Sequence, residues 1–295
     1  MLGCFEHWFG PYPWYRDGYK LVEAPHLGME HQSNVAYGNG YANGYRGRDL
    51  SGTGWGLKWD FIIIHESAHE WFGNSLTAAD LADNWVHESF ANYAESLYTE
   101  CQYGKQAGAE YQRGTRRLVR NDRPIVGPYG VNEEGSGDMY YKGGNMLHTI
   151  RQIVHDDEKW RGILRGLNVR FRHQIVTGAE VEHSMSEQAG IDLGKVFQQY
   201  LTTTQIPMFE YRIRGSRLSY RWANVVPGFD MPIEVTLRDT GYDVLQPTTS
   251  WQTARLRLAR PADFRVDPDY YVEARSVVTA AGATRPAGAR VARQR

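Results

Sequence analysis

The pattern of apolar and polar positions divides the chain into a helical middle and a strand-rich end. It predicts helices over residues 60–72, 83–103, 105–120, 142–155, 157–172 and 178–189. After Leu201 the pattern changes to short alternating runs, at 211–214, 218–222 and 233–237, separated by Gly, Pro and Asp. Period-two alternation with frequent turns is typical of a small β-sandwich, which we expect over 205–274.

Capping residues predict where several of these helices begin and end. Asp60 is the expected N-cap of a helix that runs to Phe72 and stops at Gly73. Asp83 is the expected cap of the next helix. Thr177, with Glu three residues later, has the sequence of a capping box.

The two ends of the chain differ from the helical middle in their residue pattern and composition. Residues 28–37 alternate and predict a strand, whereas seven of the nineteen residues in 38–56 are Gly, which predicts a loop. Residues 275–295 contain Ala, Gly, Val and Arg but no acidic residue, and we expect a disordered tail there.

Composition narrows the choice of protein class. A length of 295 residues favours two domains. The 33 basic and 34 acidic side chains nearly cancel, so overall charge gives no reason to expect nucleic acid or an anionic membrane as partner. Two cysteines, Cys4 and Cys101, exclude a disulfide-built scaffold and a thiolate zinc cluster but leave a single bridge open. No apolar run approaches the roughly 18 residues of a transmembrane helix.

Neither the cellular compartment nor the oligomeric state can be predicted from these features. The first residues lack the order of charged, apolar and small residues that an export signal shows. A low cysteine content is compatible with the cytosol, and equally with the bacterial periplasm or with secretion. The sequence therefore predicts neither a compartment nor an oligomeric state.

The sequence His65-Glu66-Ser67-Ala68-His69 falls within the first predicted helix and indicates a metal site. Positions i and i+4 share one helix face, so the two imidazoles can bind one ion while Glu66 lies beside it. Glu88, nineteen residues beyond His69 on the next predicted helix, is the expected third ligand. Two His and one Glu leave a coordination position open, as in catalytic sites that hold one Zn²⁺.

These residues resemble a known family. The HEXXH sequence, eighteen residues and then Glu is similar to the gluzincin metallopeptidases, and specifically to the M1 aminopeptidases. Residues 28–32 (Gly-Met-Glu-His-Gln) resemble the exopeptidase motif of that family, and residues 140–144 (Tyr-Tyr-Lys-Gly-Gly) resemble its Tyr-x-Lys-Gly motif. The resemblance implies an α+β fold, with a mainly helical thermolysin-like domain over 1–204 followed by a small antiparallel β-sandwich.

The resemblance also implies roles for individual residues. Glu66 is the implied general base and Tyr140 the phenol that stabilises the oxyanion, although Tyr141 is an adjacent alternative. Glu30, flanked by Gly28 and Met29, is implied to bind the free α-ammonium of a peptide substrate.

For three other polar residues on these helices the sequence predicts the role less definitely. Asn92 and Glu95 lie on the helix face of Glu88, where either could hydrogen-bond a ligand His. Glu70 could be a solvated helix residue.

The sequence also departs from the family pattern. Leu27 stands where the exopeptidase motif has Gly, and His31 where it has Asn. Family members carry an N-terminal β-sandwich before the residues seen here, so the chain is expected to begin inside the catalytic domain. Two alternatives to an aminopeptidase remain: a thermolysin-like endopeptidase, and a catalytically inactive zinc-binding or peptide-binding fragment.

Overall fold

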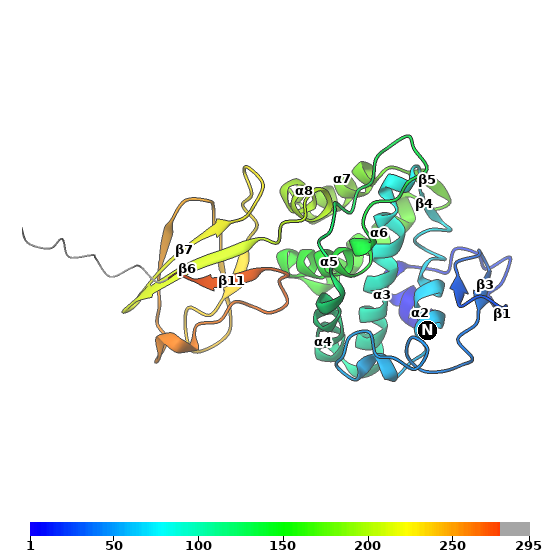
Figure 1. Cartoon of the computed structure of the whole chain (residues 1–295), viewed down its shortest axis with the longest axis horizontal. Helices are drawn as coiled ribbons and strands as arrows, with labels where there is room; N and C mark the ends of the chain where they lie inside the picture. Colours follow the sequence, from blue (N-terminus) through cyan, green and yellow to red (C-terminus); the bar gives the residue numbers. More distant parts are fainter. Residues whose placement is uncertain (278–295) are drawn as a thin grey trace, which may run out of the picture.

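The computed structural model describes residues 1–277, which form a helical body and a strand-rich module that extends from it (Figure 1). The helices are α1 (Leu2–Phe9), α2 (Phe61–Ala68), α3 (Trp85–Tyr103), α4 (Lys105–Thr115), α5 (Tyr141–Val154), α6 (Asp157–Arg170), α7 (Gly178–Ala189) and α8 (Gly194–Thr202). The α+β fold class is confirmed. We propose to divide the chain between residues 204 and 205, where the helical pattern ends.

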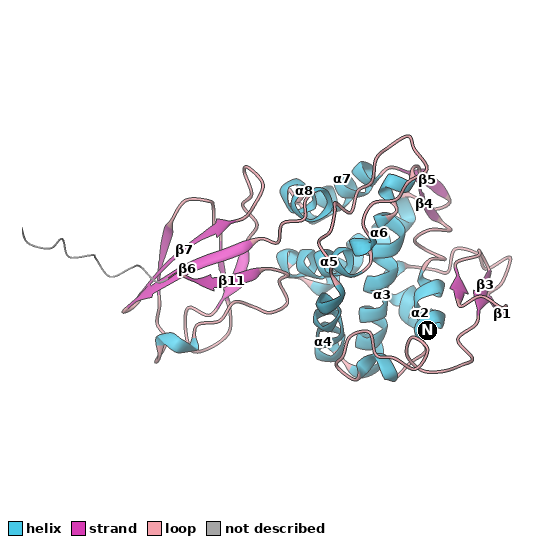
Figure 2. Ribbon diagram, in the orientation of Figure 1, coloured by secondary structure: helices cyan, strands magenta, loops and turns pink. Residues whose placement is uncertain are grey.

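The strands lie in four small sheets (Figure 2). The helical body holds β1 (Lys20–Glu23), β2 (Gly28–Met29), β3 (Asn34–Tyr37), β4 (Leu76–Ala78) and β5 (Gln174–Val176). The strand-rich module holds β6 (Met208–Arg214), β7 (Arg217–Ala223), β8 (Ile233–Val235), β9 (Asp243–Leu245), β10 (Gln252–Arg255) and β11 (Glu273–Ser276).

Helix α2 begins where the sequence predicts and ends earlier. The Asp60 side chain accepts hydrogen bonds from the backbone N–H groups of Ile62 and Ile63, so the predicted N-cap is confirmed. The helix stops at Ala68 because the chain turns at Gly73, whose φ of +135° suits glycine. His69 therefore lies at the helix end instead of inside the helix.

The start of α3 differs from the prediction. Asn84, not Asp83, is the N-cap residue, and its side chain makes no capping hydrogen bond. The Asp83 carboxylate instead accepts from the backbone N–H of Gly178 and from the Tyr129 hydroxyl, each at 2.8 Å. This aspartate thus ties the start of α3 to the start of α7, where the predicted capping box of Thr177 is confirmed.

The single strand predicted over 28–37 is wrong, because the segment folds back on itself. Strand β2 pairs antiparallel with β3, and Ser33 in the intervening turn has a φ of +60°. The Glu70 carboxylate accepts from the backbone N–H of Ser33 at 2.7 Å and is completely buried. Glu70 is therefore not a solvated helix residue, and it fixes the turn that follows Glu30.

The strand-rich module contains a four-stranded sheet in the order β10-β7-β6-β11 and a separate β8-β9 pair. The main sheet is not wholly antiparallel, because β11 runs parallel to β6. Residues 275 and 276 belong to β11, so the predicted tail begins too early. The rest of that prediction, residues 278–295, lies outside the described part of the chain.

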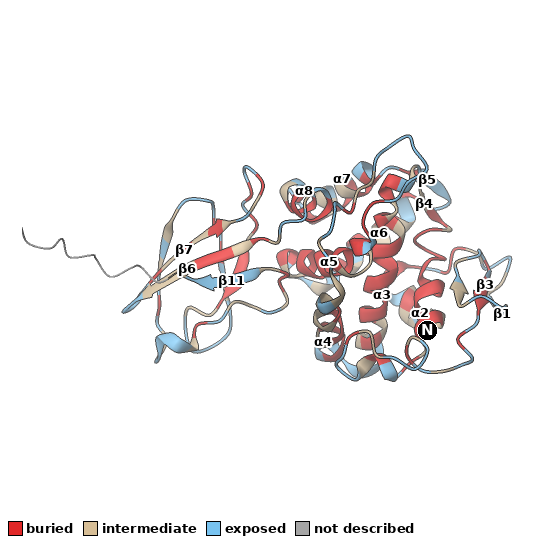
Figure 3. Cartoon of the chain, in the orientation of Figure 1, coloured by how far each residue is buried: buried red, intermediate tan, exposed pale blue. Residues whose placement is uncertain are grey.

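The core of the helical body is built around α3, which is buried along most of its length (Figure 3). Helices α2, α4 and α5 all pack against it. A helix surrounded by other helices must bury its polar side chains as well, and these need partners. Glu88, Asn92 and Glu95 of α3 are all buried, and each of them contributes to the site described below.

A disulfide joins Cys4 of α1 to Cys101 near the end of α3. The bridge links positions 97 residues apart and fastens the first helix to the central one. Within residues 1–277, no helix combines the length and the apolar character needed to cross a membrane.

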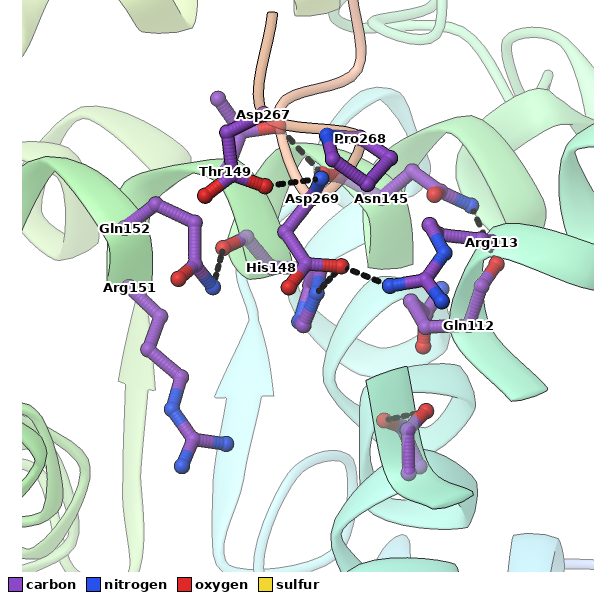
Figure 4. A network of polar contacts seen from close by, with 12 residues as sticks. Gln112, Arg113, Asn145, His148, Thr149, Arg151, Gln152, Asp267, Pro268 and Asp269 are labelled. Carbon is purple, nitrogen blue, oxygen red and sulfur yellow. Dashed lines mark hydrogen bonds and ion pairs between the residues drawn. The ribbon is translucent and has the colours of Figure 1, made fainter. Parts of the chain in front are cut away.

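The strand-rich module contacts the helical body through residues 267–271, which we call the docking segment (Figure 4). The Asp269 carboxylate forms an ion pair with Arg113 of α4 and lies 3.4 Å from Nε2 of His148 on α5. The backbone N–H of Tyr271 donates to the Thr149 hydroxyl at 2.9 Å. Burial alone would raise the pKa of Asp269, but His148 and Arg113 outweigh burial and lower it.

Replacing Asp269 with Asn should lower the free energy of unfolding at pH 7 by about 1–3 kcal/mol, because it leaves the partly buried guanidinium of Arg113 without its anion. The folded-state pKa of Asp269 is depressed, so its stabilisation is present above the unfolded pKa of about 3.9 and is lost as pH falls further. Urea unfolding between neutral and acidic pH measures both effects.

The matched control is Asp230→Asn, at an exposed aspartate for which no side-chain partner occurs among residues 1–277. It should leave stability unchanged at every pH. A deficit in Asp269→Asn that is the same at neutral pH and well below pH 4 would contradict the assigned role.

Candidate zinc site

Three side chains from α2, the turn after it and α3 point to a common centre. Nε2 of His65 lies 3.3 Å from Oε2 of Glu88, Nε2 of His69 lies 3.4 Å from the same oxygen, and the two Nε2 atoms are 3.3 Å apart. All three residues are buried. The structure thus brings together the three ligands that the sequence predicts.

These separations match tetrahedral zinc. Zinc binds imidazole nitrogen and carboxylate oxygen at about 2.0–2.1 Å, and tetrahedral angles then place neighbouring ligand atoms about 3.3–3.4 Å apart. The three observed distances of 3.3, 3.3 and 3.4 Å agree with that value. Three protein ligands leave one tetrahedral position for water or substrate, which is the arrangement of catalytic zinc sites.

The protonation of the two imidazoles follows from their outer hydrogen bonds. Nδ1 of His65 lies 2.8 Å from the Glu95 carboxylate, and Nδ1 of His69 lies 2.9 Å from the Phe72 carbonyl oxygen. Both partners are acceptors, so Nδ1 carries the proton in each ring. In the neutral ring each Nε2 therefore directs a lone pair towards the centre of the site, where it can bind a cation.

The electrostatics of the site also favour a cation. Burial lowers the pKa of His65 and His69, yet the carboxylates around them, Glu88 foremost, reverse the shift and raise it. Burial would likewise raise the pKa of Glu88, but the two imidazoles outweigh it and lower the pKa. The neighbouring His87 is neutral, since burial lowers its pKa to about 4, and its Nε2 accepts from the backbone N–H of Ala78.

Glu95 supports the ligand His65 and is itself held on several sides. Its carboxylate accepts from the Tyr111 hydroxyl at 2.6 Å and from the Asn92 amide at 3.2 and 3.3 Å. Of the two residues that the sequence offered as supports, Glu95 contacts the ligand and Asn92 contacts Glu95.

A series of buried hydrogen bonds, which we call the amide chain, continues from Glu95 to the strand-rich module. The Gln112 side chain donates to the Asn92 side chain at 3.3 Å, and Asn145 donates to the backbone carbonyl of Gln112 at 3.1 Å. Arg116 then donates to the Asn145 side chain at 2.7 Å and to the Pro268 carbonyl of the docking segment at 2.8 Å. The amides of Asn92, Gln112 and Asn145 are at most 1% exposed.

A pocket of about 520 Å³ opens beside His65 and Glu66. Its walls are mainly aromatic and aliphatic, with His26, Leu27, Gly28, Tyr45, Leu50, Phe61, Ile62, Tyr140 and Tyr141 completing the lining. Polar groups that converge at one side of an apolar pocket are the usual form of a small-ligand site.

Both candidate tyrosines line this pocket, and Tyr140 is the one coupled to the ligands. Its ring centroid lies 5.8 Å from that of His65. Burial and the nearby Glu88 carboxylate raise the pKa of Tyr140, so the phenol keeps its proton and can donate a hydrogen bond.

The segment with Gly28, Met29 and Glu30 passes directly over the zinc ligands. Carboxylate oxygens of Glu30 and Glu66 and a nitrogen of His69 all lie within 4.8 Å of one another. A Cβ on Gly28 would lie 2.6 Å from Oε1 of Glu66 and 2.7 Å from Cγ2 of Ile62, so a larger residue here would displace the Glu66 carboxylate. Met29 is 38% exposed, and its place in the substrate-binding segment stays a prediction.

Sequence reasoning missed some contributors to the site. The Phe72 carbonyl that orients His69 could not be predicted, because a backbone acceptor carries no side-chain signal. Tyr111 and the pocket residues Tyr45 and His26 come from separate loops and helices and share no spacing with the ligands.

The site and fold together are those of a zinc metallopeptidase of the HEXXH-plus-Glu class, and comparison with known proteins gives the family. Residues 57–200 match the family model described as the peptidase family M1 domain. This part of the chain is therefore an M1 peptidase domain.

Curated relatives of the chain include aminopeptidases of archaea and bacteria. It is 27% identical to the leucyl aminopeptidase of Saccharolobus solfataricus, over 54% of this chain and 21% of that protein. It is 26% identical to the probable aminopeptidase 1 of Sulfurisphaera tokodaii, over 54% and 22% respectively, and 26% identical to the aminopeptidase N of Lactobacillus helveticus, over 50% and 19%. The chain spans about a fifth of the length of these relatives.

Solved structures agree with this assignment. An M1 zinc metallopeptidase from Deinococcus radiodurans superposes with a TM-score of 0.55 at 25% identity, over 70% of this chain and 44% of that one. The similarity extends beyond the segment matched by the family model.

Replacing Glu95 with Gln should weaken zinc binding about 10- to 100-fold, because the charged partner of the Nδ1–H of His65 is lost. Competition between the protein and a chromogenic chelator measures the affinity. Glu110→Gln changes a half-buried carboxylate of α4 whose hydrogen-bond partners are Trp55 and Gln106, so it is the matched control and should keep wild-type affinity. Unaltered zinc affinity in a correctly folded Glu95→Gln variant would exclude this supporting role.

Proposed function

We propose that this protein is a zinc-dependent aminopeptidase that hydrolyses the first peptide bond of peptides with a free N-terminus. The relatives named above support the class of reaction. The position of Glu30 carries the proposal, because its carboxylate lies beside Glu66 and His69 but is not needed to complete the three-ligand zinc site.

The distance between Glu30 and the zinc ligands suits an N-terminal residue. The α-nitrogen of an amino acid is only about 2.5 Å from its own carbonyl carbon. A carboxylate within 4.8 Å of Glu66 and His69 can therefore hold the ammonium while the first peptide carbonyl lies at the metal. Charge favours the same ligand, since Glu30, Glu66 and Glu88 together exceed the charge of one Zn²⁺.

The residues around the site then have defined tasks. His65, His69 and Glu88 would hold a zinc ion, which would supply acidification of a water molecule and polarisation of the peptide carbonyl. Glu66 accepts the proton of the attacking water and transfers it to the leaving amine. The Tyr140 hydroxyl donates a hydrogen bond to the oxygen that gains negative charge.

Replacing Glu66 with Gln should lower kcat about 10²- to 10⁴-fold, because the neutral amide cannot accept the proton. A panel of aminoacyl chromogenic substrates, free and N-acetylated, measures the rates, and zinc content is determined on the same samples. The wild type should turn over the free-amine substrates only.

The outcomes of this panel separate the alternatives. Equal rates on acetylated and free substrates would identify an endopeptidase. Full zinc occupancy without turnover of any substrate would identify an inactive zinc-binding module and contradict the proposal.

Replacing Glu30 with Gln should reduce kcat/KM for free-amine substrates about 10- to 100-fold, because a charge-assisted hydrogen bond to the ammonium is lost. Zinc affinity should stay unchanged, since Glu30 is not one of the three ligands. Glu23→Gln on the exposed edge of β1 is the matched control. Wild-type kcat/KM in the Glu30→Gln variant would show that another group binds the substrate amine.

A further inference from the structure

The outer face of the four-stranded sheet is dominated by arginines. Phe209, Leu218 and Trp222 are buried on its inner face, and the residues that alternate with them point outwards. Strand register places six arginines on the outer face: Arg212 and Arg214 of β6, Arg217 and Arg221 of β7, Arg255 of β10 and Arg275 of β11. We call this set the arginine face.

The end of the arginine face at the β6–β7 turn concentrates like charges. Arg214 pairs in register with Arg217, and Arg217 pairs in register with Arg255, so three arginines stand side by side across three strands. Adjacent strands are only about 4.8 Å apart, and like charges directly opposite one another destabilise a sheet. All three are exposed, and the turn points away from the helical body (Figure 1).

The protein neutralises only part of this charge. Arg221 and Arg275 both pair with the buried carboxylate of Glu210. Arg212 lies over the ring of Trp251, at 3.9 Å from its centroid. Among residues 1–277, no side-chain hydrogen bond or ion pair involves Arg217 or Arg255.

The position next in register is polar, and the ring of Trp251 lies nearby against Arg212 and Arg221. Ser219 of β7 lies between Arg212 and Thr253 on the outer face, so two short hydroxyl side chains separate longer guanidinium groups. Guanidinium groups match phosphate oxygens in pairs, and hydroxyls can add single hydrogen bonds to the same oxygens. The face therefore has the chemistry of a phosphate-binding surface.

We propose that the arginine face binds the phosphate headgroups of an anionic membrane surface. Its charges extend over four strands and four residues along β7, or about 14 Å in each direction, so they form a flat array. A nucleic acid strand would follow one line of charges, whereas a planar array of headgroups meets them all. This local charge contrasts with a net charge of −1 for the whole chain.

Two further features agree with a purely electrostatic contact. The aromatic side chain on this face, Trp251, is half-buried against Arg212 and Arg221 and is not free to insert, so binding rests on charge. The sequence from 278 to 295 adds four arginines and no acidic residue directly after β11, so its charge has the same sign.

The test is sedimentation of the full chain with vesicles of phosphatidylcholine alone or mixed with phosphatidylglycerol. Binding should occur only to the anionic vesicles at low salt and should be lost at about 0.3 M salt, where charges are screened. The double variant Arg217→Gln/Arg255→Gln should bind about 30-fold more weakly, since each basic residue near an anionic surface contributes about five-fold.

Matched variants keep the result interpretable. Arg16→Gln/Arg48→Gln removes the same charge from two exposed arginines of the helical body and should bind as the wild type does. Arg217→Lys/Arg255→Lys retains the charge and should keep most of the binding, which separates loss of charge from loss of fold. Thermal unfolding verifies that every variant is folded.

Three results would overturn the proposal. The first is no binding to anionic vesicles at low salt, and the second is equal loss of binding in the control pair. The third is tighter binding of a single-stranded oligonucleotide than of the vesicles to the arginine face. That result would identify a nucleic acid as the partner.

Discussion

Repulsion among three electron pairs at one point is the constraint on which the helical body depends. Two imidazole Nε2 atoms and a Glu88 oxygen lie buried 3.3–3.4 Å from one another, and the raised pKa values of both histidines show that this centre attracts positive charge, as protons or as a metal ion. Such an arrangement is unstable without a cation, so the surroundings must hold it in place. The early end of α2, the Phe72 carbonyl and the Glu95 carboxylate all serve that purpose, and zinc would complete the coordination that they prepare.

The sequence predicts those parts of the site that depend on local spacing. The i, i+4 pair His65 and His69, the distant Glu88 and the Asp60 cap are each recognisable from residue type and position. The turn between β2 and β3 is not, because it is held by Glu70 from another element. The end of α2 and the cap of α3 escape prediction for the same reason: contacts between distant segments override local preference.

The strand-rich module shows why overall composition can mislead. Acidic and basic residues nearly cancel over the whole chain, yet strand register gathers six arginines on one sheet face. Period-two alternation predicts that these residues share a face of their strand. Only the order of the strands shows that the faces lie next to one another, and β11 joins β6 from the far end of the described chain.

The amide chain constrains how this protein can change over evolutionary time. The Gln112 side chain donates to the Asn92 side chain, so a substitution at either one leaves a buried polar atom of the other unsatisfied, whereas Asn145 donates to the Gln112 backbone carbonyl, which any residue at 112 offers. Single replacements at 92 or 112 are costly, while joint replacements that restore the pairing are tolerated. Related sequences should therefore vary at positions 92 and 112 together, while position 145 should vary independently of position 112.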